Sequence, residues 1–171
     1  VWFWFDGSGS PYFDDYNEYI LKTLQEEKVK TDLWIGVPEE YFGVESDILK
    51  LEKAKQLIDY TYHRAKEIGC TISLYNHGGW FGIPKNQVRI IESLGLSDIG
   101  IIYNFHHAHD QIEDFSSNLY LKIKYLKGVN LNGMKKEGHK IIPIGNGNKE
   151  TDMIKLLIES GYNGPIGIIG H

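Results

Sequence analysis

Several features that mark specialised classes of protein are scarce in this sequence. The chain has one cysteine, Cys70, so it has no partner for an internal disulfide and no CxxC metal motif. No apolar run approaches the roughly 18 residues that a membrane-spanning helix needs, and no signal peptide is recognisable. Because the first residue is Val1 rather than Met, a removed leader and a lost N-terminal segment both stay open. We expect a soluble protein, either cytoplasmic or secreted with its leader removed.

Basic charge and nucleotide-binding loops are also scarce. The chain carries 18 Lys and Arg against 23 Asp and Glu, a formal net charge of -5. No basic stripe is interleaved with aromatic residues, which disfavours a nucleic-acid partner. Neither a GxGxxG nor a GxxxxGK[ST] turn is present, so the usual support for a nucleotide-binding sheet is missing. A small neutral or polar ligand fits this composition better.

What the sequence does have is a regular alternation of strand and helix patterns. With 171 residues, 42% of them hydrophobic, it can form one domain with a sizeable core, spanning 1–171. Short apolar runs that end at Gly, Pro or Asp alternate with stretches whose apolar residues recur at helical spacing. The predicted strands are 1–5, 32–38, the start of 71–80, 99–103, 126–133, 141–147 and 164–171. The predicted helices are about 14–28, 47–68, 84–94, 112–123 and 151–160.

Such alternation predicts βα units, a parallel sheet and right-handed crossovers. A complete (β/α)₈ barrel takes about 250 residues. We therefore expect an α/β fold of the TIM-barrel type that is incomplete, with six or seven parallel strands and without its N-terminal βα unit or units and its last helix. An open doubly wound sheet is the competing architecture. An incomplete barrel leaves strand edges unpaired at 1–5 and 167–170, so we expect either a longer parent protein, which we favour, or closure as a homo-oligomer.

The stretch IGIIYNFHHAHD, residues 99–110, is the most informative part of the chain. It begins as a buried apolar strand and then places an asparagine, three histidines and an aspartate within seven positions. Parallel α/β proteins gather ligands at the carboxyl ends of their strands. The sequence therefore predicts a site at this end of the sheet, although a polar loop without a site would show the same composition.

The order of the strand ends resembles a known family. The runs LYNHGGW (74–80), IYNFHHAHD (102–110), VNLNGM (129–134), IIPIGNG (141–147) and SGYNGPIGIIGH (160–171) are similar to successive strand ends of the xylose-isomerase-like TIM barrels, the sugar phosphate isomerase and epimerase superfamily. The resemblance covers about residues 32–171. It implies a barrel whose rim holds a divalent metal and acts on a sugar by proton transfer.

The chain departs from that family at nearly every metal ligand. The positions of the family's carboxylate and imidazole ligands match Tyr75, Asn104, Asn130 and Ile169, whereas His107 is kept. Neutral amides with one imidazole bind hard divalent cations weakly. No cofactor is therefore certain. A softer, imidazole-based site for Zn²⁺ or Mn²⁺, drawn from His77, His106, His107 and His109, stays open. In an extended segment the adjacent His106 and His107 point to opposite sides, so only one of them shares a face with His109, and the expected pair is His107 with His109.

The remaining polar residues suggest a carbohydrate site. Amide side chains match the donor and acceptor character of sugar hydroxyls, and Trp80 could stack on a sugar face. His77 and His107 follow adjacent strands, so one could act as base and the other as acid beside a carbonyl. Both could equally hold the rim rigid through bonds to the backbone. The predicted ligand-binding residues are Asn76, Trp80, Asn104, Asn130, Asn132 and Asn146.

Two functions remain open at this stage. The first is a carbohydrate isomerase, epimerase or keto-sugar lyase. The second is a catalytically degenerate barrel that binds a sugar or a protein partner without turnover. The retained His77 and His107 favour the enzyme, and the loss of the carboxylate ligands favours the binder.

Overall fold

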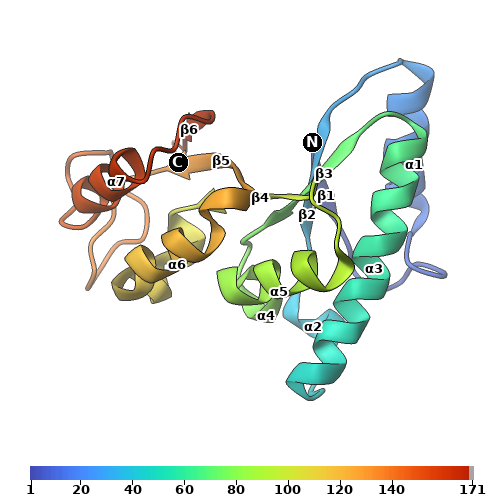
Figure 1. Ribbon diagram of the computed structural model, residues 1–171, viewed down its shortest axis with the longest axis horizontal. Coiled ribbons are helices and arrows are strands. Elements are labelled where there is room, and N and C mark those ends of the chain that lie inside the picture. Colours follow the sequence, from blue (N-terminus) through green and yellow to red (C-terminus); the bar gives the residue numbers. More distant parts are fainter. Residues whose placement is uncertain (170–171) are drawn as a thin grey trace.

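The computed structural model describes residues 1–169, and it forms a six-stranded sheet in which neighbouring strands are parallel (Figure 1). The strands pair in sequence order, β1-β2-β3-β4-β5-β6. This confirms the predicted α/β fold with TIM-barrel strand order and rules out a doubly wound order. The strands are β1 (Trp2–Trp4), β2 (Asp32–Gly36), β3 (Thr71–Tyr75), β4 (Gly100–Asn104), β5 (Leu126–Leu131) and β6 (Ile166–Ile168).

Helices connect the strands and cover one face of the sheet. In Figure 1, α1 and α3 lie at one end of the molecule, and α7 with β6 lies at the other. The α-helices are α1 (Asp15–Glu26), α2 (Glu39–Phe42), α3 (Asp47–Glu67), α4 (Gly79–Gly82), α5 (Pro84–Leu94), α6 (Phe115–Lys122) and α7 (Glu150–Glu159). Two 3₁₀ helices flank α6, namely η1 (His106–Asp114) and η2 (Ile123–Tyr125).

The period of two along each strand separates an outer face from an inner face. In β1, Phe3 is fully buried on the outer face against the helices, whereas Trp2 and Trp4 point to the inner face. The register carries this alternation across the sheet, since Trp2 pairs with Trp34 and Asn104 pairs with Asn130. The buried outer row is Phe3, Leu33, Ile35, Ile72, Leu74, Ile101, Tyr103, Val129 and Leu131. The inner face is therefore left to the aromatic and polar residues.

Local sequence signals set the ends of the two helices that pack on the centre of the sheet. Ser46 caps α3 by accepting a hydrogen bond from the backbone N–H of Leu49. Pro84 occupies the first turn of α5, where its missing N–H costs nothing. Gly95 ends α5 in the left-handed conformation, with φ of 67°. The predicted boundaries of these helices are confirmed.

Four segments differ from the prediction. Residues 141–147 were expected to form a strand, but only a single antiparallel bridge between Gly133 and Ile142 forms there, and Pro143 supplies no N–H for a ladder. The histidine segment after β4 was expected to be a loop and instead coils into η1. The glycine loop after β3 contains the short helix α4. The last strand is shorter than predicted, and Gly170 and His171 lie outside the described residues.

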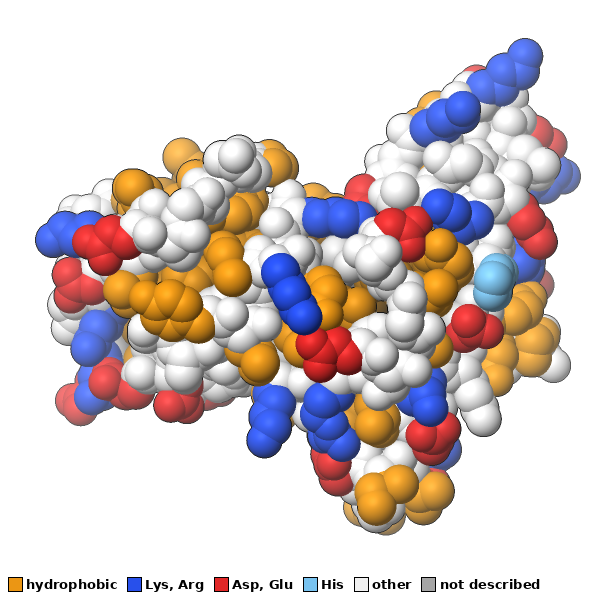
Figure 2. Space-filling model, viewed as in Figure 1, with side chains coloured by type: hydrophobic (Ala, Val, Ile, Leu, Met, Phe, Trp, Pro, Cys, Tyr) orange, Lys and Arg blue, Asp and Glu red, His pale blue; other side chains and the backbone are white. Residues whose placement is uncertain are grey.

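Charged side chains of both signs share the visible surface. Figure 2 shows acidic and basic side chains mixed over the visible face rather than separated by sign. Among the helices of residues 1–169, none combines the length and apolarity needed to cross a bilayer. On β6, Ile166 and Ile168 are 51% and 74% exposed on the outer face, so the helix layer stops short of this strand.

One buried carboxylate organises the long segment between β5 and α7. Glu150 is 1% exposed and accepts hydrogen bonds from the backbone N–H groups of Gly147 (2.8 Å), Gly145 (3.1 Å), Lys149 (3.3 Å) and Met134 (3.4 Å). Burial alone would raise the pKa of Glu150, but these N–H groups outweigh it and hold the pKa below its usual value. The carboxylate thus replaces the ladder bonds that a strand at 141–147 would have made.

We expect Glu150→Gln to destabilise the protein by about 1–3 kcal/mol, because the amide retains one acceptor and turns a donor toward backbone N–H groups. Urea unfolding would measure the loss. Glu159→Gln, at an exposed position of α7, is the matched control and should leave the midpoint unchanged. Equal stability of the two variants would contradict the role given to Glu150.

Candidate functional site at the carboxyl ends of the strands

Two of the predicted residues meet at the carboxyl ends of β3 and β4. The rings of His77 and His107 have centroids 4.2 Å apart, with 52° between their planes. His106 adds a third imidazole, 3.7 Å from the His107 ring. The parallel register places the ends of β3 and β4 side by side, and η1 then turns the chain back so that His106 and His107 stand next to His77.

An aromatic wall borders this imidazole cluster. Trp2 and Trp4 project from β1 and their ring centroids lie 5.4 and 4.9 Å from that of His77. Tyr75, at the end of β3, meets the His107 ring edge-on at 5.4 Å. Trp34 of β2 extends the wall, with its ring 5.9 Å from that of Tyr75. Aromatic faces beside hydrogen-bonding groups are suited to the alternating apolar and polar surface of a sugar.

Asn104 connects the strand ends through both its backbone and its side chain. Its backbone N–H donates to the Asn76 side-chain oxygen at 2.7 Å, and its carbonyl accepts from the Asn76 amide at 3.0 Å. Its side-chain amide donates to Tyr75 Oη at 2.8 Å. Its side-chain oxygen accepts from the backbone N–H of His106 at 3.2 Å and lies 3.0 Å from that residue's Nδ1. Asn76 is thereby used to join two strands, and Asn104 to position two rim residues.

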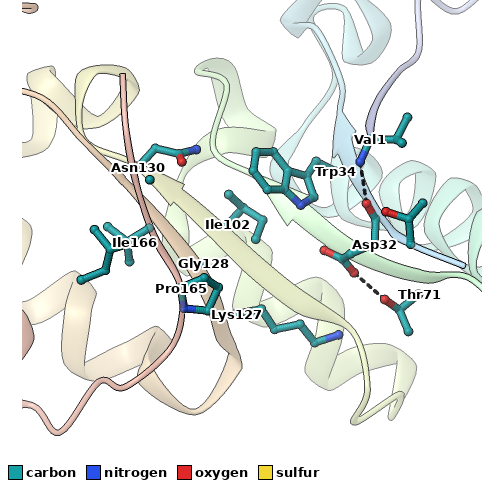
Figure 3. Close-up of a pocket in the computed structure, with 13 residues that line it drawn as sticks. Val1, Asp32, Trp34, Thr71, Ile102, Lys127, Gly128, Asn130, Pro165 and Ile166 are labelled. Carbon is teal, nitrogen blue, oxygen red and sulfur yellow. Dashed lines mark hydrogen bonds between the residues drawn. The ribbon is translucent and has the colours of Figure 1, made fainter. Parts of the chain in front are cut away.

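A cavity lies on the inner face of the sheet and reaches toward the amino ends of the strands, and Trp34 is the residue of the aromatic wall that lines it (Figure 3). Its volume is about 720 Å³, within the range of small-molecule sites. Trp34, Ile102 and Asn130 line it, and Figure 3 shows them toward the same end of the cavity. At the other end Asp32 accepts a hydrogen bond from Thr71 at 2.6 Å.

Burial controls the charge state of the cluster. Desolvation, with added repulsion from His106, His77 and Lys140, lowers the pKa of His107 to about 3. Burial also lowers the pKa of His77 and raises that of Tyr75. Both imidazoles and the phenol are therefore neutral near pH 7. The site can accept a proton at an imidazole and can donate hydrogen bonds without carrying a fixed charge.

The other predicted site residues lie elsewhere. The Trp80 ring packs on Phe42 at 5.1 Å and its indole N–H donates to Asp47 at 2.8 Å, so it joins α4 to the helix layer. Asn132 is buried and donates to the carbonyls of Gly133 and Lys140. Asn146 is exposed in the segment that was expected to be a strand. These three side chains hold the structure or face solvent.

His109 does not join the imidazole cluster. Its Nε2 lies 2.7 Å from the carbonyl oxygen of Lys135, an acceptor, so this nitrogen carries the proton and donates. The predicted pairing of His107 with His109 assumed an extended segment. In the 3₁₀ helix η1, residues two apart point to different sides, which separates the two rings.

The donor atoms at the rim do not fit a divalent metal. The positions where the family resemblance implies ligands hold a phenol and amides, and Asn104 and Tyr75 are hydrogen-bonded to each other. Hard cations prefer carboxylate oxygens. Within residues 1–169, no group of three or more His, Cys, Asp or Glu side chains is arranged to hold a metal ion. We therefore derive no chemical step through a metal.

The aromatic wall was not predicted from the sequence, and His106 was considered only as a metal ligand. The signal for the wall was present: alternation in VWFWF puts Trp2 and Trp4 on the face opposite Phe3 and Phe5. What the sequence did not show was the register that sets these rings beside His77. The role of His106 depends on the helical turn of η1, which the polar composition of the segment concealed.

Comparison with known proteins identifies the family of the fold. The family model described as xylose isomerase-like TIM barrel matches residues 27–169. Two similar solved structures are 3-keto-D-glucoside 4-epimerase from E. coli (14% identity, TM-score 0.62) and D-psicose 3-epimerase from Clostridium cellulolyticum H10, solved with D-tagatose (15%, 0.63). A third is the IolI protein, solved with a zinc atom (13%, 0.64).

These similarities cover most of this chain and only part of the other structures. The alignments include 90%, 88% and 98% of this chain and 61%, 53% and 64% of the respective structures. No curated protein matches the sequence. At such low identity the structural similarity establishes the fold and leaves the activity to be argued from the site.

We expect the His107 ring to stay neutral until the pH approaches about 3, and ¹⁵N-detected NMR of the imidazole would measure this. In the unfolded chain the ring takes its proton near pH 6.5. Between about pH 3 and 6.5 the His107 ring is therefore protonated in the unfolded state and neutral in the folded state. The free energy of unfolding consequently decreases as the pH falls from about 6.5 toward 3. His107→Gln should show a shallower loss of stability over that range. Protonation of His107 near neutrality would contradict the account.

Proposed function

The chain belongs to the xylose isomerase-like TIM barrel family, and from this premise we propose that it isomerises a sugar or keto-sugar by proton transfer at the carboxyl-terminal rim of the barrel. The observation that carries the proposal is the contact between the His77 and His107 rings, whose centroids are 4.2 Å apart. Two neutral imidazoles and an aromatic wall meet at this point, and Trp34 of that wall also lines the cavity on the inner face.

The spacing of the two rings favours isomerisation over inversion of a carbon centre. Inversion by two bases requires one base on each face of the reacting carbon. Because carbon atoms pack at about 3.5–4.0 Å, two groups on opposite faces would stand about 7 Å apart. The His77 and His107 rings are much closer and therefore serve a single face. Removal and return of a proton on one face converts a ketose to an aldose.

The two imidazoles suit two different parts of that reaction. His77 has a lowered pKa, so its ring is unprotonated near neutrality and takes the proton from the carbon beside the carbonyl. The C–H electron pair forms a C=C bond, and the carbonyl pair moves to oxygen to give an enediolate. The imidazolium returns its proton to the former carbonyl carbon. His107, held neutral, passes the remaining proton from one oxygen to the other.

The rest of the rim suits a carbohydrate ligand. Trp2, Trp4 and Trp34 offer aromatic surface, and Asn130 places an amide in the cavity wall. Structures of similar fold include epimerases of D-psicose and of a 3-keto-D-glucoside, which is consistent with this class of ligand. Zinc is present in one such structure, but the donor atoms here differ from a metal site, and the proposed steps use none.

The test is solvent exchange. The protein is incubated in D₂O and chelator with D-fructose, D-tagatose, L-ribulose and dihydroxyacetone, and NMR follows deuterium at the carbons beside the carbonyl. We expect incorporation together with the aldose isomer of at least one sugar. His77→Gln should lower the rate by about 10²–10⁴-fold, the contribution of a general base.

His63→Gln is the matched control, because this histidine is exposed on α3. It should exchange at the wild-type rate. Sugar binding without deuterium exchange would overturn the proposed isomerase activity and favour a barrel that binds carbohydrate without turnover. Exchange accompanied by inversion at the labelled carbon would overturn the single-face mechanism.

A further inference from the structure

Resting on the proposed isomerisation, the geometry points to Tyr75 as a further catalytic residue: its phenol donates a hydrogen bond to the oxygen that becomes negatively charged in the enediolate. The phenol would supply the electrostatic stabilisation that enolising sites commonly obtain from a cation or from preorganised donors. The argument depends on the direction of one hydrogen bond, that between Tyr75 and Asn104.

The direction of this bond follows from the backbone. The backbone N–H of His106 can only donate, and it points at one side-chain atom of Asn104, 3.2 Å away. That atom must therefore be the oxygen of Asn104. The opposite atom is then the nitrogen, which donates to Tyr75 Oη at 2.8 Å. Tyr75 Oη is the acceptor, so its own proton is not used in this bond.

Tyr75 stands beside the two imidazoles, with a phenolic proton that the bond from Asn104 does not use. The phenol cannot donate back to the Asn104 nitrogen, which is itself a donor. The Tyr75 ring borders His107 at 5.4 Å and His77 at 6.0 Å. In the proposed complex, a carbonyl oxygen held against these imidazoles lies beside the Tyr75 ring and accepts the unused phenolic proton as a hydrogen bond. Packing fixes the ring, which is 9% exposed and flanked by Trp2 and Trp34.

The charge state of Tyr75 suits a donor. Burial raises the pKa of the phenol, so it keeps its proton throughout the neutral range. A neutral donor that is already oriented needs no rearrangement as charge develops on the substrate oxygen. In the proposed step the phenol keeps its proton and shares it with the enediolate oxygen, while the imidazoles carry out the proton transfers.

Tyr75→Phe tests the inference with the exchange assay described above. It removes the phenolic oxygen and keeps the ring and its packing. We expect kcat for deuterium incorporation to fall about 10²–10³-fold, the cost of losing one such donor, with little change in KM. Tyr62→Phe is the matched control: it removes the hydroxyl that donates to Asp98 at 3.2 Å on the outer surface, and it should leave the rate unchanged.

A second variant changes the direction of the proton without removing the phenol. In Asn104→Asp the donor nitrogen becomes a carboxylate oxygen, which accepts from Tyr75 and draws the phenol proton away from the site. With chelator present, we expect this variant to be as slow as Tyr75→Phe. If Tyr75→Phe incorporates deuterium at a rate within about threefold of the wild-type rate, the inference is overturned and the proposed function stays intact. Absence of exchange in the wild type with all four sugars would overturn both.

Discussion

The site depends on the pairing of β3 with β4 at their carboxyl ends. There the Asn76 side chain bonds both to the backbone N–H and to the carbonyl of Asn104. These two bonds continue the ladder by one step through a side chain, and both partners are buried. Because buried backbone groups must find partners, this pair fixes the strand ends relative to each other. The positions of Tyr75, His77 and His106 all follow from that fixed point.

Asparagine therefore has a different role here from that of a ligand-binding residue alone. An amide has both donors and an acceptor, which lets Asn104 hold a phenol on one side and a backbone N–H on the other. A carboxylate at the same position could not donate to Tyr75. The amide thus serves an arrangement of neutral groups, whereas a carboxylate would serve a cation. The lowered pKa of His77 and of His107 is consistent with the same neutral, desolvated environment.

Much of the fold could be read from the sequence because its signals are local. Pro84 and Gly95 mark the ends of α5, and the apolar strands are separated by lengths that suit βα units. The segment 141–147 was wrongly predicted as a strand because its apolar residues follow a strand-like pattern. Its backbone N–H groups at Gly145 and Gly147 instead donate to the carboxylate of Glu150, which comes later in the chain. A contact of that kind leaves no periodic trace in the sequence.

The site was partly predictable for the same reason. His77 and His107 could be placed together because each directly follows a strand, and parallel strands end at one edge. Trp80 could not be excluded, because its outward direction depends on the contact with Phe42 and the bond to Asp47. His109 was misplaced through the assumption of extended backbone, which η1 replaces. Tertiary packing, rather than composition, decided each of these cases.

The central claim is that the rim is built from neutral donors and acceptors instead of metal ligands. Calorimetric titration of Zn²⁺ and Mn²⁺ into chelator-treated protein tests this most directly, with elemental analysis of the purified protein beside it. The account predicts no stoichiometric metal and no binding at micromolar affinity. Stoichiometric metal binding that is lost in His107→Ala would contradict this claim and would favour a metal-dependent reaction.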